Sequence, residues 1–350
     1  MKLGTSALLF LSGASVVAAV YTRRSKARRL RDRQEAEDAL KQSIIETALQ
    51  THGSVVSVEH DADILGATVG QTLLLIEQIP GISPSEREDI VRIINLLAYK
   101  LGAVRYHCKR YVDIRQKRYV EISENKRMLD LIKRGVTDCE RDMDYEFEAW
   151  LHQVKSSLDI LVQLFHPVLG SRRSEPWTYG RKGDDIITHL QQTKKHKKIV
   201  VQLNLDLWKI DGLIELIGNN RDAWIKSIVE WRDTISHRLP FIQIGFTWDT
   251  SAGQLKEPLA VEGNNKRPIS EIMQQVSQIL INYARDFIAF TLACRRPKDA
   301  RLRPLTETER RYYAALWTSQ GSEVDVEAAR WRFNDAPEIT EADLKAVLGA

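Results

Sequence analysis

Hydrophobic positions recur three and four residues apart through most of the chain, which is the spacing of one face of an α-helix. The widest such stripe lies between 147 and 165 and consists of Phe147, Trp150, Leu151, Val154, Leu158, Leu161 and Phe165. Similar patterns predict helices near 184–193, 203–217, 221–237 and 270–293. The sequence therefore predicts an all-α protein built as a helical bundle.

Capping signals indicate where two of the longer helices begin. The segment 83–86 (SPSE) combines a capping box with a proline in the first turn, and both features favour a helix start. The helix that begins there is expected to reach Lys133, with Gly102 as a point at which it could break. A second box at 137–140 (TDCE) is expected to start the next helix.

The N-terminus carries a membrane signal. From Leu3 to Tyr21 the chain holds about 19 residues without a charge, just enough for a helix that spans a bilayer core. An arginine-rich run follows at 23–33, and basic residues beside a membrane helix normally stay in the cytoplasm. We therefore expect a retained single-pass anchor at 1–22, with the main domain in the cytoplasm. A cleaved signal peptide is the alternative, although its basic side normally precedes the apolar segment.

Behind this anchor the chain divides into three expected parts. Residues 23–136 are expected to form a basic juxtamembrane segment and a helical arm, and residues 137–296 the helical bundle. Residues 297–350 are expected to form a C-terminal tail in which Thr306 and Thr340 begin short helices. Neither the arm nor the tail carries a catalytic motif, so the bundle is the part in which we look for chemistry.

Composition narrows the function classes. A net charge of +4 on 350 residues is small, and much of the positive excess lies in the basic run near the N-terminus. This argues against a protein that coats nucleic acid through bulk charge. The cysteines Cys108, Cys139 and Cys294 lie far apart within helical patterns, which is typical of buried thiols in a reducing compartment. No zinc-ligand spacing and no nucleotide-binding loop occurs, so we expect neither a metal ion nor a cofactor.

The strongest candidate for chemistry is the segment 231–238 (WRDTISHR), at the end of a helix that Pro240 stops. Arginine binds phosphate, and histidine transfers protons near neutral pH. Arg232 is suited to stabilise charge on phosphoryl oxygens, and His237 to act as a general acid or base on a ribose 2′-hydroxyl or the leaving 5′-oxygen. Asp233 is placed to orient either side chain. Such a reaction needs no metal ion.

The surroundings of this segment resemble the HEPN superfamily. A helix containing SSLDIL at 156–161, a variable loop, further helices and a helix ending EWRDTISHR occur in that order between about 138 and 295. An extended strip at 241–248 and a long final helix complete the order. The resemblance implies a helical-bundle fold, and the members of this superfamily include metal-independent RNases. Their motif is an arginine, a polar residue and a histidine four to six positions after the arginine. In this chain those positions are Arg232, Asp233 and His237. The resemblance also implies RNA as a partner and a homodimer in which both motif helices face one cleft.

The spacing of the motif leaves a non-catalytic interpretation open. On an ideal helix Arg232 and His237 point about 140° apart, so both meet one cleft only if the helix end distorts or if two helices build the cleft. In the alternative, Arg232 pairs with Asp159 or Glu230 and His237 is a polar helix-end residue. The two candidate functions are therefore a membrane-anchored RNase and a non-catalytic scaffold that binds a partner at the cytoplasmic membrane face.

Two further polar clusters have both a simple and a functional interpretation. His107 lies in a basic, aromatic segment at 105–110 (RYHCKR), which is either a solvated helix face or a contact for RNA. The segment 194–198 (KKHKK) is either a solvated turn or a contact for phosphate or lipid.

Overall fold

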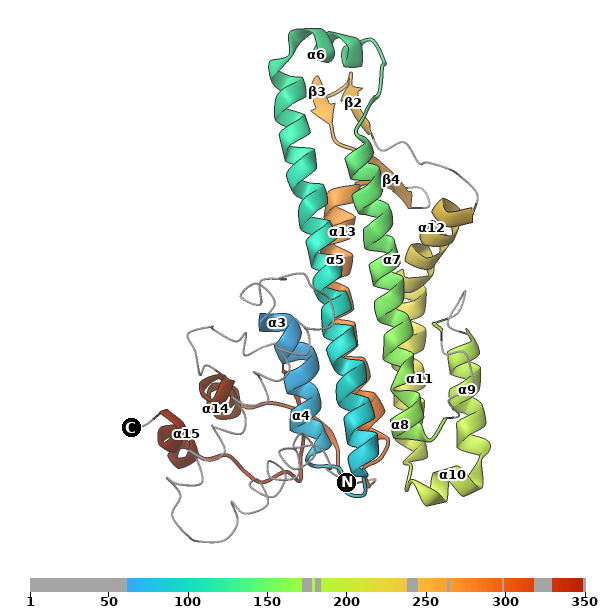
Figure 1. The fold of residues 1–350 in the computed structure, drawn as a ribbon, viewed down its shortest axis with the longest axis vertical. Helices are drawn as coiled ribbons and strands as arrows, with labels where there is room; N and C mark the ends of the chain where they lie inside the picture. The colour runs from blue at the N-terminus through green and yellow to red at the C-terminus, as the bar shows by residue number, and fades with distance from the viewer. Residues whose placement is uncertain are drawn as a thin grey trace, which may run out of the picture.

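Three long helices run side by side along the axis of the molecule in the computed structural model, which describes residues 62–171, 178–179, 184–237, 245–262, 265–297, 299–317 and 329–348 (Figure 1). They are α5 (Pro84–Glu124), α7 (Arg141–Gln163) and α13 (Ile269–Ala293). α7 packs along α5 and both pack against α13. The described chain is mostly helical and its strands are short, which confirms the all-α prediction at the level of class.

Shorter helices cover two sides of this central group. On the α7 side lie α8 (Phe165–Leu169), α9 (Asp184–Lys195), α10 (Lys197–Gln202), α11 (Leu207–Asn220), a π-helical turn η3 (Arg221–Ile225) and α12 (Lys226–His237) (Figure 1). On the other side lie α3 (Ala62–Leu65), a second π-helical turn η2 (Gly66–Gly70) and α4 (Gln71–Ile76), which pack on α5 and α13. The predicted anchor and juxtamembrane segment up to 61 lie outside the described residues. Within the described residues, no helix combines the length and the apolar character needed to cross a bilayer.

Ser83 and Asn125 mark the two ends of α5. Ser83 and Glu86 form the predicted capping box: each side chain accepts from the other residue's backbone N–H, at 3.2 and 2.7 Å. Gly102 does not break the helix, because it lies buried in the middle of a continuous run of intrahelical bonds. The break comes at Asn125, whose side chain accepts from the backbone N–H of Met128 at 3.2 Å and starts α6 (Lys126–Lys133).

The predicted capping box at 137–140 is wrong. Asp138 and Cys139 form a short strand, β1, that pairs antiparallel with β2 (Gly245–Asp249). Arg118 on α5 donates to both oxygens of the Asp138 carboxylate at 2.8 Å. The Asp138 side chain is therefore bound to α5. The side chain of Glu140, at the N-cap of α7, makes no capping hydrogen bond.

Small antiparallel sheets close the end of the bundle at which α6 lies. β2 pairs with β1 and with β3 (Gln254–Lys256), while β4 (Leu259–Glu262) pairs with β5 (Asn265–Pro268). Gly245 is required at its position because a Cβ there would lie 2.7 Å from the carbonyl oxygen of Asp138. β2 is the described part of the predicted extended strip, whose first four residues lie outside the described residues.

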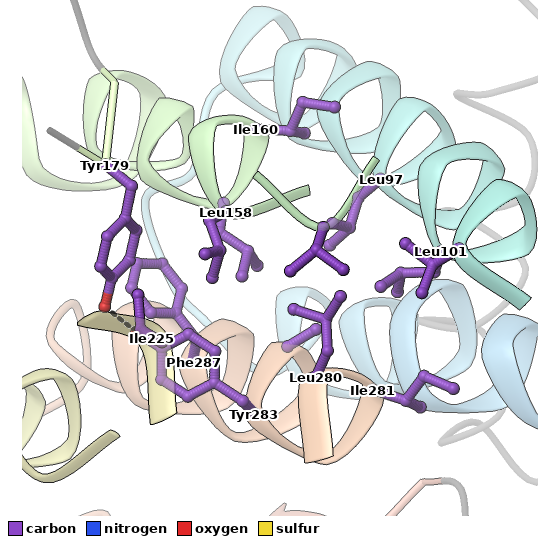
Figure 2. Close-up of a cluster of buried hydrophobic side chains, with 14 of the residues drawn as sticks. Leu97, Leu101, Leu158, Ile160, Tyr179, Ile225, Leu280, Ile281, Tyr283 and Phe287 are labelled. Carbon is purple, nitrogen blue, oxygen red and sulfur yellow. Dashed lines mark hydrogen bonds between the residues drawn. The ribbon is translucent and has the colours of Figure 1, made fainter. Parts of the chain in front are cut away.

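Buried side chains from the described elements form one main hydrophobic core. It contains residues from α3 through α13 and reaches Phe333 near the C-terminus. Figure 2 shows Leu97 and Leu101 of α5 facing Leu158 of α7 and Leu280 of α13, with the hydroxyl groups of Tyr179 and Tyr283 in contact at 2.6 Å. α5 and α7, which lie on either side of the expected boundary between arm and bundle at 136 and 137, bury their apolar faces against each other.

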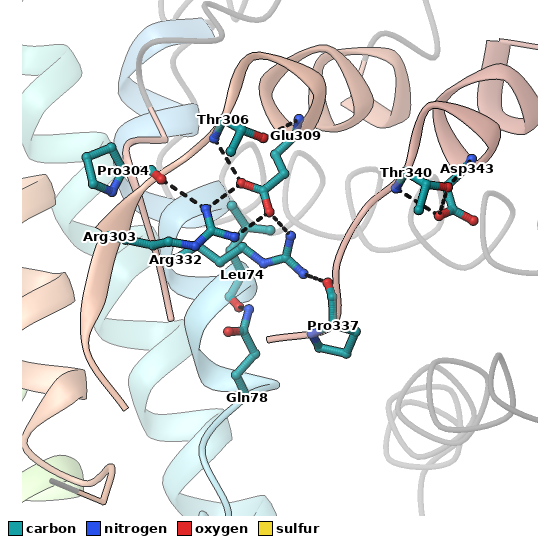
Figure 3. Close-up of polar contacts among 10 residues, drawn as sticks. All are labelled: Leu74, Gln78, Arg303, Pro304, Thr306, Glu309, Arg332, Pro337, Thr340 and Asp343. Carbon is teal, nitrogen blue, oxygen red and sulfur yellow. Dashed lines mark hydrogen bonds and ion pairs between the residues drawn. The ribbon is translucent and has the colours of Figure 1, made fainter. Parts of the chain in front are cut away.

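The C-terminal residues form a smaller unit beside α4. They contain α14 (Glu307–Trp317), α15 (Glu341–Leu348) and a hairpin of β6 (Leu302–Pro304) and β7 (Trp331–Phe333). The predicted short helices start where expected, because Thr306 and Thr340 accept from the backbone N–H of Glu309 and Asp343 at 3.3 Å. Glu309 also pairs with Arg303 and Arg332 in a buried ion cluster (Figure 3). The tail thus packs on α4 as a folded unit with its own small core.

Candidate functional site

The predicted motif lies on α12, which packs against α7 through its apolar face. Ile228 and Val229 are buried, and the ring of Trp231 lies 6.3 Å from the ring of Phe147. The periodicity of the sequence predicts this buried face. Arg232 follows directly after Trp231, so its backbone lies at the edge of the helix–helix contact.

The segment before the motif differs from the prediction. The helices predicted near 203–217 and 221–237 are joined, because α11, η3 and α12 follow one another without a break from Leu207 to His237. The side chain of Asn220 donates to the carbonyl oxygen of Leu216 and accepts from the indole N–H of Trp224, both at 2.9 Å. α12 is therefore the last part of a long rod, and its end projects towards β4 (Figure 1).

Arg232 and Asp233 form an ion pair on this rod. The Nη1 atom of Arg232 donates to Oδ1 of Asp233 at 2.8 Å, and the two side chains are 29% and 30% exposed. The Nε atom of Arg232 is buried and has no hydrogen-bond acceptor among the described residues. The guanidinium group thus lies half-buried beside a carboxylate, with most of its N–H groups unused by the described part of the protein.

The partners suggested for Arg232 by the sequence differ from the observed one. Asp159 accepts from the side chain of Lys155 and, at 2.6 Å, from the backbone N–H of Tyr179. It therefore serves to hold the described part of the variable loop against α7. The pairing of Arg232 with Asp159 or Glu230 is wrong, since the adjacent Asp233 provides the carboxylate.

His237 is the last residue of α12, and its side chain lies outside the described residues. The structure therefore brings two of the three predicted site residues together, Arg232 and Asp233. Along a regular helix the side chain at position 237 leaves the axis about 140° away from that at position 232. The geometry of a single α12 thus favours different sides of the helix for the two groups.

Other histidines on the described elements lie in polar contacts that the sequence did not indicate. His107 is within 2.7 Å of Glu146 on α7, so the predicted RNA-contact segment carries an interhelical pair. The Nε2 atom of His189 lies 2.9 Å from the hydroxyl oxygen of Ser171. Ser171 is buried, and its backbone N–H donates to the carbonyl oxygen of Phe165. Partners on separate helices or loops leave no local spacing signal. Both contacts stabilise the fold.

The described residues hold no group of three or more His, Cys, Asp or Glu side chains placed to bind a metal ion. Comparisons of the chain with protein-family models, curated proteins and solved structures find no match.

Proposed function

We propose that this protein is a membrane-anchored, HEPN-like RNase that cleaves RNA without a metal ion, with Arg232, Asp233 and His237 as its catalytic group. The observation that carries the proposal is the half-buried Arg232–Asp233 pair on the surface of α12, in which Arg232 lies five residues and Asp233 four residues before His237. A guanidinium group with unused N–H donors matches the geometry of a phosphodiester.

Each residue has a distinct part in the proposed reaction. Arg232 binds the non-bridging phosphoryl oxygens and stabilises the negative charge that grows on them during attack. His237 accepts the proton of the ribose 2′-hydroxyl or donates one to the leaving 5′-oxygen. Asp233 holds the guanidinium group through the 2.8 Å hydrogen bond, which limits its rotation before RNA binds.

The proposed active form is a homodimer. Because positions 232 and 237 face different sides of one helix, a single α12 does not present both groups to one phosphate. Two copies of α12 that cross near their ends place Arg232 of one copy beside His237 of the other. The resemblance of the sequence to the HEPN superfamily supports this arrangement.

The proposed location is the cytoplasmic face of a membrane, with residues 1–22 as a single-pass anchor. This part of the proposal is supported by the uncharged segment 3–21 and the arginine-rich run that follows it.

A non-catalytic scaffold at the same membrane face is the second candidate. It is favoured by the fact that Arg232 already has an ion-pair partner within its own subunit. In this function the pair stabilises the surface of α12, and the bundle serves for dimerisation or for binding a partner.

The deciding experiment measures RNA cleavage by the full-length protein with EDTA present. Wild type is compared with Arg232→Ala and His237→Ala, and the controls are Arg221→Ala and His152→Ala. Arg221 serves as the arginine control because it too donates to the adjacent residue, Asp222, at 2.9 Å, although it also pairs with Asp184 on α9. The RNase proposal expects cleavage in wild type and both controls and a loss of at least about 100-fold in the two site variants. Inactive wild type, or equal activity in all five proteins, would support the scaffold.

A further inference from the structure

One corner of the bundle combines exposed apolar side chains with a cluster of lysines. It is formed by residues 194–211, which include the end of α9, all of α10 and the start of α11 (Figure 1). We refer to this segment as the α10 corner. It lies at the end of the bundle opposite to α6 (Figure 1).

The apolar side chains at this corner are unusually exposed. Val201 is 79% exposed, Trp208 66% and Leu207 41%. All three lie between 201 and 208, where the end of α10 turns into the start of α11. Single exposed apolar residues are common on protein surfaces, whereas a contiguous group indicates an interaction site. A large exposed indole ring is an especially strong indication of such a site.

The backbone of the turn holds these side chains outward. The Asp206 side chain accepts from the backbone N–H of Trp208 at 3.0 Å and fixes the start of α11. The backbone N–H of Asp206 donates to the carbonyl oxygen of Cys294 at 2.9 Å, and Leu205 packs into the core. The turn is thus attached to the bundle on one side, and Trp208 faces away from it.

The charge of the corner is strongly positive. Its sequence contains five lysines and two aspartates. Both aspartates are already paired, Asp211 with Lys194 and Asp206 with Lys209. The remaining lysines, Lys195, Lys197 and Lys198, are exposed and have no carboxylate partner within the described parts of the chain.

We propose that the α10 corner binds the surface of a bilayer rich in anionic lipids. Trp208, Leu207 and Val201 enter the interfacial layer, while Lys195, Lys197 and Lys198 contact the phosphate and carboxylate groups of the lipids. An exposed tryptophan with aliphatic neighbours and lysines beside them is the composition of an interfacial membrane contact. The inference depends neither on RNA cleavage nor on the N-terminal anchor, because it rests on the described residues of this corner alone.

A bilayer fits the corner better than RNA or a protein does. Single-stranded RNA stacks its bases on aromatic rings in a basic groove. Here the neighbours of the tryptophan are Val201 and Leu207, and aliphatic side chains offer no ring on which a base can stack. Arginine, whose planar guanidinium group binds phosphate and carboxylate groups through two parallel hydrogen bonds, is absent from 194–211. Lysines act as point charges, and a fluid anionic surface requires no more than that.

The test places an environment-sensitive fluorophore at the corner of the full-length protein. A Val201→Cys variant that also carries Cys139→Ser, so that position 201 offers the accessible thiol, is labelled and mixed with, or reconstituted into, vesicles of phosphatidylcholine with or without phosphatidylserine. A Leu131→Cys variant with the same Cys139→Ser change, which places the label on α6 at the opposite end of the bundle, is the matched control. We expect a blue shift of emission at position 201 that requires phosphatidylserine and is reversed by salt, and no shift at position 131.

Two further variants separate charge from insertion. Replacing Lys195, Lys197 and Lys198 together by glutamine should raise the lipid concentration required for the phosphatidylserine-dependent shift by about 100-fold, since each lysine near an anionic surface contributes about fivefold. Trp208→Ser should reduce it by about tenfold. Circular dichroism checks that both variants remain folded.

Several outcomes would overturn the proposal. They are the absence of a shift at position 201 with either lipid mixture, an equal shift at position 131, and a shift that the triple glutamine variant retains. A shift at position 201 produced by RNA or by a protein in the absence of vesicles, and not by vesicles, would assign the corner to that partner instead. RNA cleavage is not part of any readout, so failure here leaves the proposed RNase function untouched.

Discussion

Trp150 and Ser277 meet in the centre of the bundle, where the indole N–H of Trp150 on α7 donates to the hydroxyl of Ser277 on α13 at 3.1 Å. Trp150 is fully buried and Ser277 nearly so. The hydroxyl of Ser277 in turn donates to the carbonyl oxygen of Met273 at 2.6 Å. This bond fixes the relative position of two helices that lie far apart in the sequence.

Replacing Ser277 by alanine should destabilise the protein by about 1–3 kcal/mol. The variant leaves the indole N–H of Trp150 buried without an acceptor, and water does not reach it. Ser123→Ala is the control, since Ser123 makes the same bond to the carbonyl four residues earlier but is exposed. Urea unfolding of both variants gives the difference. Equal changes in the free energy of unfolding would mean that the Trp150–Ser277 bond contributes nothing.

The two arginines Arg232 and Arg295 should respond very differently to alanine substitution. Arg232 is 29% exposed and pairs with its neighbour, so its loss should cost under about 1 kcal/mol. The side chain of Arg295 is 5% exposed and donates to Glu86 at 2.8 Å and to the carbonyl oxygen of Gly81 at 3.0 Å. Its loss leaves these acceptors partly unsatisfied and should cost about 3 kcal/mol.

Thermal unfolding of Arg232→Ala and Arg295→Ala measures both effects. A small loss for Arg232 would show that this variant is folded and that its RNA cleavage can be interpreted directly. If Arg232→Ala lowers the stability as much as Arg295→Ala does, Arg232 has mainly a structural role.

Glu309 should make the stability of the C-terminal unit depend on pH. Burial favours the neutral carboxyl and by itself raises the pKa, but hydrogen bonds from Arg303 and the Thr306 backbone and the charge of Arg332 outweigh it, so the pKa falls from 4.5 to about 2 (Figure 3). Since the folded pKa lies below the unfolded value, the stabilisation is fully present above about pH 4.5 and is lost as the pH falls towards 2.

The stability difference between wild type and Glu309→Gln measures this effect. It should shrink by roughly 2 kcal/mol between about pH 6 and about pH 3, because glutamine does not titrate. Glu341→Gln is the control, since Glu341 lies exposed and accepts one hydrogen bond from Thr308. A difference that stays constant with pH, or one that Glu341→Gln reproduces, would contradict the assigned role of Glu309.

Local patterns in the sequence predict the helices well but not the contacts between them. The capping box at Ser83 and the apolar stripe of α7 depend on neighbours in the sequence, and both are found in the structure. The signal at 137–140 fails because Asp138 and Cys139 pair with a strand that is distant in the sequence, β2, so that α7 begins only at Arg141. The shared core of α5 and α7 has no local signal either, since it depends on how two helices turn back on each other.

The candidate site shows the same division. The position of Arg232 at the edge of the buried face of α12 follows from helical periodicity. Its partner does not, because adjacent residues on a helix normally point apart and yet the long arginine side chain bends back to Asp233. The exposure of Trp208 in the α10 corner cannot be predicted from the sequence either, since it depends on the turn that Asp206 fixes.

The three cysteines should differ in their reaction with a thiol reagent in the folded protein. Cys108 and Cys294 are buried on α5 and directly after α13, and burial raises the pKa of both thiols, that of Cys294 to about 12. Cys139 is only half-buried, because it lies on strand β1 rather than in the helix that the sequence predicts. Burial also raises its pKa, so it should react slowly but before the others.

We expect one thiol per chain to be labelled near neutral pH and all three after denaturation, with the fast native signal absent in Cys139→Ser. Labelling of Cys108 or Cys294 at a similar rate would show that the contact between α5, α7 and α13 opens readily in solution.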